Sequence, residues 1–285
     1  MSISCAIAEN KVAVISLSGP IQSQGTGLLF GGSVISPQFV RDQVEKAKTD
    51  MAVKAIVIQV ESPGGSAAAS QEILNEFELA KKPIVVSMGD VVASGGYYIS
   101  AKADKIVALP GTLTGSIGVI VEIPNLKGLF EKLGIKMEVF TAGEHKDMYA
   151  GLRELTPEEK VLMQEITDQI YDQFVQVVVE GRGLSEDKVR ELATGQLYTG
   201  VQAKELGLVD ELGGLNTAID LAASLAGIKK PKVEYYKPEV PSILNALLGT
   251  SLQKLRSIIQ VQSLSAEGII LLETLNNPYP QPEYR

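Results

Sequence analysis

The run Asp90-Val91-Val92-Ala93-Ser94-Gly95-Gly96-Tyr97-Tyr98 lies at the centre of the chain's motifs. It follows an apolar, strand-like segment, Ile84 to Met88, and its two glycines predict a sharp turn into a helix. Ser94 stands at this turn with no bulky neighbour on its C-terminal side, so its hydroxyl is exposed enough to attack an electrophile. The run therefore predicts a nucleophilic serine between a strand and a helix.

A second glycine turn, Ser62-Pro63-Gly64-Gly65, ends another apolar run, Ala55 to Val60. Glycine lets backbone N–H groups point outward at such a turn, and outward N–H groups are what an oxyanion hole requires. We therefore interpret the two turns as halves of one site.

Apolar runs alternate with helical patterns along the first half of the chain, which predicts an α/β fold with right-handed crossovers. The runs are apolar on both faces, as in a covered parallel sheet. Strands are expected at Lys11 to Leu17, Val53 to Val60, Ile84 to Met88, Lys105 to Leu109, Lys136 to Phe140 and Lys232 to Tyr236. Helices are expected after Ser36-Pro37, from the Gly64-Gly65 turn to Lys81, from Ser94 to Ala101, from Leu126 to Leu133, from Thr156 onward, after Ser185, and from Leu215 to Ala226.

Composition excludes several classes of protein. The 285 residues carry a net charge of −8 and no basic stripe, which argues against a nucleic-acid partner. The single cysteine, Cys5, cannot form an internal disulfide. No signal peptide is visible, and glycines and prolines interrupt the uncharged stretch from Val12 to Val40, so no transmembrane anchor can be drawn. We expect a chain that is cytoplasmic or peripheral to the membrane.

Two neighbouring residues could activate the serine. His145 is the only histidine, and Lys146 follows it directly. A lysine serves as a base only in its neutral form, which burial favours, and it needs a second hydroxyl to orient the amine. Ser116, in Thr114-Gly115-Ser116-Ile117-Gly118, is the candidate for that hydroxyl. From the residues alone both bases stay open, as do a helix-capping role for Ser94 and a solvated role for Lys146.

Several motifs together resemble one family. They are Ser62-Pro63-Gly64-Gly65-Ser66, Ala93-Ser94-Gly95-Gly96-Tyr97-Tyr98, Thr114-Gly115-Ser116-Ile117-Gly118-Val119, Gly143-Glu144-His145-Lys146-Asp147, and the later Tyr198-Thr199-Gly200 and Gly207-Leu208-Val209-Asp210. Their order and spacing are similar to those of the signal peptide peptidase A family of serine peptidases, over residues 10 to 230. Four ordered motifs are far more specific than a lone glycine pattern.

The resemblance implies the Clp protease and crotonase fold of repeated ββα units, followed by a partly helical C-terminal extension. It implies that Ser94 is the nucleophile, that Lys146 is the general base, and that Gly65 donates its N–H to the oxyanion. Ser116 would hold the lysine, and His145 would be a bystander. The peptidase domain would comprise residues 1–230 and the extension residues 231–285, ending in a proline-rich tail.

The resemblance also implies partners and substrates. Members of the family form rings or domes in which neighbouring subunits share each active site, and they cleave remnant signal peptides and other unstructured peptides through a Ser/Lys dyad. We accordingly expect a homo-oligomeric serine endopeptidase that needs no cofactor and no metal. Most members have an N-terminal transmembrane anchor, which is not visible here.

Other interpretations stay open. A crotonase-like acyl-thioester enzyme uses similar glycine turns, an inactive scaffold could keep the fold, and a Ser/His/Asp peptidase could use His145. Leu28 to Phe30 could form an apolar lip for substrate or for a neighbouring subunit. The amphipathic stretch from Ile243 to Ile259 is expected to pack on the core or on another subunit, and its alternative use is peripheral membrane contact.

Overall fold

An eight-stranded sheet forms the centre of the computed structural model, which describes residues 9–23 and 34–236. Its strands are β1 (Lys11–Ser18), β2 (Val53–Ser62), β3 (Ile84–Ala93), β4 (Lys105–Ala108), β5 (Leu113–Gly115), β6 (Leu197–Thr199), β7 (Glu211–Leu212) and β8 (Lys232–Tyr236). Their order is β6-β5-β3-β2-β1-β8, with β4 beside β3 and β7 beside β4. All pairs are parallel except β5 with β6.

The sheet forks along β3. The first part of β3 pairs with β4 through Val85 to Ser87, and its last part pairs with β5 through Val91 to Ala93. Between these parts the register against β2 shifts, because Val60 pairs with Met88 but Ser62 pairs with Val92. The end of β3 therefore turns toward a second set of strands immediately before Ser94.

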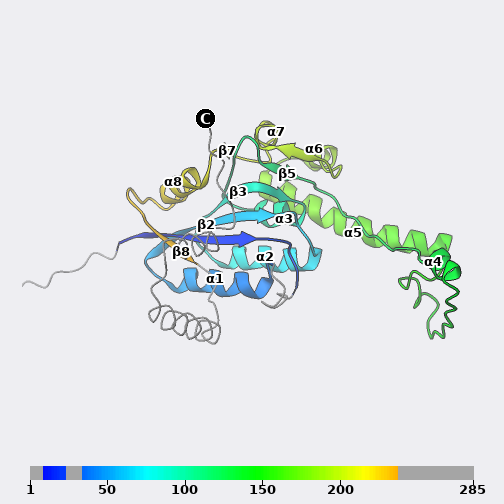
Figure 1. Ribbon diagram of the computed structural model, residues 1–285. Helices are drawn as coiled ribbons and strands as arrows, with labels where there is room; N and C mark the ends of the chain where they lie inside the picture. The colour runs from blue at the N-terminus through cyan, green and yellow to red at the C-terminus, as the bar shows by residue number, and fades with distance from the viewer. Residues whose placement is uncertain (1–8, 24–33, 237–285) are drawn as a thin grey trace, which may run out of the picture. The chain divides into compact units, whose positions relative to one another are not determined.

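Helices cover both faces of the sheet (Figure 1). They are α1 (Pro37–Thr49), α2 (Ala67–Leu79), α3 (Gly95–Ser100), α4 (Lys127–Lys132), α5 (Pro157–Arg182), α6 (Glu186–Leu192), α7 (Gly200–Glu205) and α8 (Leu215–Leu225). Alternate residues of the buried strands face opposite sides. Ile15, Ile56 and Ile58 share a core with α1, α2, α3 and the second half of α5, whereas Val14 and Val57 pack against α8.

The expected α/β fold is confirmed, with its mostly parallel sheet. Local signals give several element starts correctly: Ser36 caps α1 through the N–H of Phe39, and Thr156 forms a capping box with Glu159 at the start of α5. The strand expected at Lys136 to Phe140 is wrong, since these residues form no helix or strand and Phe140 is 92% exposed. The motif Thr114-Gly115-Ser116-Ile117-Gly118 begins within the short strand β5.

The end of the chain is only partly described. β8 follows residue 230 and pairs with β1, so it belongs to the sheet. Cys5, the lip at Leu28 to Phe30, the stretch from Ile243 to Ile259 and the proline-rich tail lie outside the described residues. Among the helices of residues 9–23 and 34–236, none combines the length and the apolar character that crossing a bilayer requires.

Candidate active site

Ser94 occupies a strained turn between β3 and α3. Its φ of 52° and ψ of −124° lie in a region that non-glycine residues avoid, at a cost of about 1–3 kcal/mol. Its N–H donates to the carbonyl of Gly115 (2.9 Å), and its own carbonyl accepts from Tyr98 N–H (2.9 Å). Although Ser94 precedes the helix, its hydroxyl makes no capping hydrogen bond. The side chain is therefore available for chemistry, and the capping role considered for Ser94 is not observed.

The Gly64-Gly65 turn lies directly against this serine. A Cβ atom on Gly64 would come within 2.8 Å of Ser94 Cβ, and one on Gly65 would come within 2.1 Å of the Ile21 carbonyl oxygen. Both positions thus require glycine, at φ values of 101° and 153°. The expected contact between the two glycine turns is present.

The backbone of Gly65 is fixed by a bridge to Ile21. Ile21 forms a parallel bridge with Gly65 by donating to Gly64 O and accepting from Ser66 N, both at 2.9 Å. In such a bridge the central residue of the second strand turns its own N–H to the opposite side. The N–H of Gly65 therefore points away from Ile21, and Gly65 N lies 3.2 Å from the place of a Cβ on Gly95.

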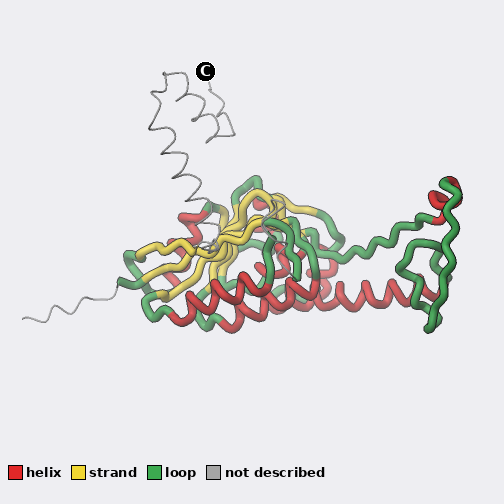
Figure 2. The backbone as a smooth tube through the Cα atoms, turned by 60° about the horizontal axis from the view of Figure 1, so that its bottom comes forward, coloured by secondary structure: helices red, strands yellow, loops and turns green. Residues whose placement is uncertain are grey.

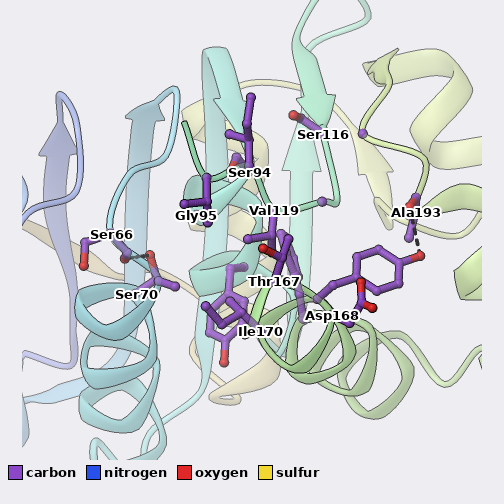
Figure 3. A pocket seen from close by; sticks show the side chains of 18 of the residues that line it. Ser66, Ser70, Ser94, Gly95, Ser116, Val119, Thr167, Asp168, Ile170 and Ala193 are labelled. Carbon is purple, nitrogen blue, oxygen red and sulfur yellow. Dashed lines mark hydrogen bonds between the residues drawn. The ribbon is translucent and has the colours of Figure 1, made fainter. Parts of the chain in front are cut away.

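Ser116 lies on a third turn, immediately after β5. Its φ is 48°, and its N–H donates to Gln196 O (2.8 Å), while Gly195 donates to Ile117 O (3.0 Å). This pairing continues the antiparallel ladder between β5 and β6 and holds Ser116 on the same side as Ser94. Figure 3 shows the two serines on neighbouring turns, with α5 beneath them.

Ser94, Gly65 and Ser116 line one cavity of about 820 Å³. Its apolar wall includes the rings of Tyr98 and Phe174, which meet edge to face with centroids 5.1 Å apart. Tyr171 and Gln164 of α5 also line the cavity. Figure 3 shows further lining residues around the rings and on α5: Val119, Ile170, Ala193, Thr167 and Asp168. A cavity of this kind can accept an apolar side chain next to a reacting carbonyl.

Lys146 does not line this cavity. It is exposed on the loop between α4 and α5, and neighbouring residues bind Glu159 in the first turn of α5. Phe174, which does line the cavity, follows Glu159 by fifteen residues, or about 22 Å of helix. Figure 2 shows the long helix with the segment around α4 at its far end. Within one chain, the structure therefore brings together three of the four expected site residues and separates Lys146 from them.

The loop that carries Lys146 is held by an ion-pair cluster. Arg153 donates to both carboxylate oxygens of Asp147 (2.6 and 2.8 Å) and to both oxygens of Glu159 (2.7 Å each). Hydrogen bonds from Arg153 and from the N–H of Thr156 lower the pKa of Glu159 to about 2. The same guanidinium lowers the pKa of Asp147. His145 Nδ1 lies 3.4 Å from Glu159 Oε1, at the long end for a hydrogen bond.

The sequence analysis did not identify three residues that shape the site. The first is Arg153, although its position just before the capping box of Thr156 and Glu159 indicated that it lies near the start of α5. Glu61 is another: its carboxylate accepts from the N–H groups of Asp90 (2.6 Å) and Val91 (3.0 Å), which β2 leaves unpaired at the register shift. Gly95, the first residue of α3, has an N–H that the helix cannot satisfy, beside that of Gly65.

The described residues offer no alternative centre based on a metal. Residues 9–23 and 34–236 contain no group of three or more His, Cys, Asp or Glu side chains that could hold a metal ion. The chemistry that the described cavity supports is attack by Ser94 on a carbonyl, with backbone N–H groups facing the charge that develops.

Comparisons with known proteins point to the same chemistry. The model of peptidase family S49 matches residues 76–229. The chain is 37% identical over 281 residues to the Enterococcus faecium protein named "Putative signal peptide peptidase SppA", covering 97% of this chain and 81% of that protein. It is 36% identical over 252 residues to "Protease 4" of Salmonella typhi, covering 87% and 40%. It is 35% identical over 247 residues to "Serine protease SPPA, chloroplastic" of Arabidopsis thaliana, covering 84% and 36%.

Proposed function

This chain belongs to peptidase family S49, a family of serine-type peptidases, and from that premise we propose that it is an endopeptidase with a Ser/Lys dyad. Ser94 is the nucleophile and Lys146 the general base. The substrates are signal peptides or other unstructured peptides. The observation that carries this proposal is the strained, uncapped Ser94 beside the Gly64-Gly65 turn in an 820 Å³ cavity.

Lys146 reaches Ser94 from a second copy of the chain. Within one chain Lys146 does not line the cavity, and its loop is bound to Glu159 in the first turn of α5, so an intramolecular dyad would require the loop to leave these contacts. The residues around the lysine loop also expose large apolar side chains, including Phe140 (92% exposed) and Tyr149 (59%). Apolar surface of this kind favours association between chains. Contact between copies would also withdraw Lys146 from water, which favours the neutral amine that a base requires.

The proposed reaction proceeds in two halves. Lys146 Nζ takes the proton of Ser94 Oγ as that oxygen bonds to the scissile carbonyl carbon. The resulting oxyanion accepts hydrogen bonds from the N–H groups of Gly65 and Gly95. When the C–N bond breaks, Lys146 gives the proton to the departing amine, leaving an acyl group on Ser94. Lys146 then deprotonates a water molecule that attacks the ester, and the proton returns to Ser94 as the acid product leaves.

Ser116 is assigned to orienting the lysine amine. It lines the same cavity as Ser94, and its backbone is held by the bond from its N–H to Gln196 O (2.8 Å). A hydroxyl fixed at this position can accept a hydrogen bond from an amine that enters the cavity. Ser116 thus completes the site from the side of the chain that provides the nucleophile.

The cavity fits an extended peptide with a small or apolar side chain before the scissile bond. Tyr98, Phe174 and Ile170 form its apolar part, whereas the exposed polar residues of α5 face solvent. A folded protein could not bring its backbone within reach of Ser94, which is only partly exposed at the base of a turn. The signal-peptide substrate is supported by the similarity to the Enterococcus faecium protein named "Putative signal peptide peptidase SppA".

The decisive experiment compares the unaltered protein, Ser94→Ala, Lys146→Ala and an equimolar mixture of the two variants. The assay is cleavage of a fluorogenic peptide with an apolar residue before the scissile bond. We expect each single variant to lose at least about a thousandfold in kcat/KM, and the mixture to regain part of the activity. A mixture that stays inactive after dissociation and reassembly of the two variants would refute a site shared between copies.

His145→Gln serves as the matched control on the neighbouring residue. Glu159 is already bound by Arg153 and by Thr156 N–H, and His145 lies 3.4 Å from it, so we expect kcat/KM to stay within about threefold. A loss of about a thousandfold, with Lys146→Ala still active, would instead support a histidine base held by a carboxylate.

A further inference from the structure

The residues on both sides of Lys146 contact the same ion-pair cluster of Arg153, Asp147 and Glu159. Asp147 binds Arg153 through two hydrogen bonds, and His145 Nδ1 lies 3.4 Å from Glu159, which Arg153 also binds twice. Glu159 is 1% exposed, although the lysine between these neighbours is exposed. The lysine therefore projects from a loop whose flanks are attached to the interior of the chain.

The cluster also connects this loop to a rigid helix. Glu159 is the third residue of α5, where it accepts from Thr156 N–H (2.9 Å) and its own N–H donates to Thr156 Oγ1 (3.1 Å). A capping box of this kind fixes the first turn of a helix. The second half of α5 packs in the core through Phe174, Val175 and Val178. The chain of contacts thus runs from the core, along α5, through Glu159 and Arg153 to the loop.

We propose that Arg153 is a positioning residue for the general base, which fixes the Lys146 loop to α5 so that the amine can meet Ser94 of a second copy. This inference rests on the proposed function, because it assigns Arg153 a role in the reaction only if Lys146 is the base. Nothing else attaches Asp147 to the helix among the described hydrogen bonds of residues 9–23 and 34–236.

Arginine is suited to this task for a geometric reason. Its planar guanidinium can bind two carboxylates at once, each through two parallel hydrogen bonds, whereas a lysine ammonium is a single point charge. Without Arg153 the negative charges of Asp147 and Glu159 would face each other without compensation. The loop would then move away from α5, and the amine would lose its fixed place. Displacements of about 1 Å at a reacting group can reduce the rate about a hundredfold.

The role predicts a specific kinetic signature. Arg153→Ala should lower kcat by about tenfold to a hundredfold and change KM by less than about threefold, because Arg153 does not line the substrate cavity. Arg153→Lys, which keeps the charge but not the paired geometry, should fall between Arg153→Ala and the unaltered protein. The control is Arg41→Ala, which also removes an arginine bound to two carboxylates. Arg41 lies on α1 and its partners Glu72 and Glu76 lie on α2, so this ion pair does not contact the lysine loop. This variant should leave kcat unchanged.

Placement of the variant in mixed oligomers separates positioning from a general structural effect. In a mixture of Ser94→Ala and Lys146→Ala chains, only the Ser94→Ala chain provides the lysine. Arg153→Ala should therefore reduce activity about tenfold or more when added to the Ser94→Ala chain. It should have no effect when added to the Lys146→Ala chain, whose loop serves no productive site.

The outcomes distinguish the two proposals. Inactivity of the mixture with Arg153 intact would count against the shared dyad itself. An active mixture that loses the same activity whichever chain carries Arg153→Ala, or loses none, would overturn the positioning role while leaving the dyad in place. If Arg153→Ala fails to fold, as judged by circular dichroism, Arg153→Lys is placed in each chain in turn and the same asymmetry is required.

Discussion

At the scale of single residues, backbone strain is concentrated at the proposed site. Ser94 and Ser116 are two of the three non-glycine residues with positive φ in the described part of the chain, the third being Lys81. Both serines line the cavity. Such conformations persist only when the surrounding structure determines them. Here the bonds from Ser94 N–H to Gly115 O and from Ser116 N–H to Gln196 O hold the two turns. The strained backbone of these two serines therefore lowers the free energy of unfolding at the place where the reactive hydroxyl is exposed.

Glycine at position 94 should relieve this strain. We expect Ser94→Gly to unfold with a free energy about 1 kcal/mol higher than that of Ser94→Ala, because only glycine adopts φ 52° and ψ −124° without a Cβ clash. Neither variant should cleave peptide. Urea unfolding of both variants at one protein concentration measures the difference, and equal stability would show that residue 94 is not strained.

At the scale of elements, α5 connects the cavity to the lysine loop, so its packing determines both. Phe174 meets Tyr98 in the cavity wall. Arg182, the last residue of α5, binds Asp210 (2.8 Å) and the Gly207 carbonyl (3.1 Å). Between them Gly181 lies so close to α3 that a Cβ would come within 2.2 Å of Ala101 O. The helix is therefore held against the core over its second half only.

Gly181→Ala should push α5 away from α3. We expect a loss of about 1–3 kcal/mol in the free energy of unfolding, because the obstructing atom belongs to the backbone and cannot rotate away. Gly128→Ala in α4 is the control. No atom lies within 4 Å of its added Cβ, so stability should stay equal or rise slightly. Thermal or urea unfolding compares the pair, and similar changes for both variants would contradict the close packing of α5.

At the scale of the whole molecule, stability at low pH should depend on the carboxylate cluster. Arg153 lowers the pKa of Glu159 from 4.5 to about 2, so the folded state binds its proton more weakly than the unfolded state does. The stabilisation from this group is therefore complete above about pH 4.5 and is lost as the pH falls through about 2.

Glu159→Gln should remove this contribution to the pH dependence. The variant should be less stable than the unaltered protein at neutral pH, and the difference should shrink as the pH falls from 4.5 toward 2. Equilibrium unfolding of both proteins at a series of pH values measures the difference. A constant difference across this range would mean that Glu159 titrates alike in the folded and unfolded states.

The sequence by itself predicted β1 to β4, β8 and the glycine turns in their order, and it singled out Ser94, Gly65 and Ser116, but it did not predict the short strands β5, β6 and β7. These features follow from local causes: runs of apolar residues, capping residues such as Ser36 and Thr156, and glycines at turns. The strand expected at Lys136 to Phe140 failed because alternation alone does not provide a neighbouring strand, and these residues pair with none in the described chain.

Only the tertiary structure decided how the site is assembled. It turned the Gly65 N–H away from Ile21 and placed Gly65 N beside Gly95. It also kept Lys146 out of the cavity that Ser94 lines and placed Arg153 between Asp147 and Glu159. The physical reason is the distance along the chain between the residues that interact. Local patterns extend over a few residues, whereas these contacts depend on the packing and direction of elements that lie far apart in the chain.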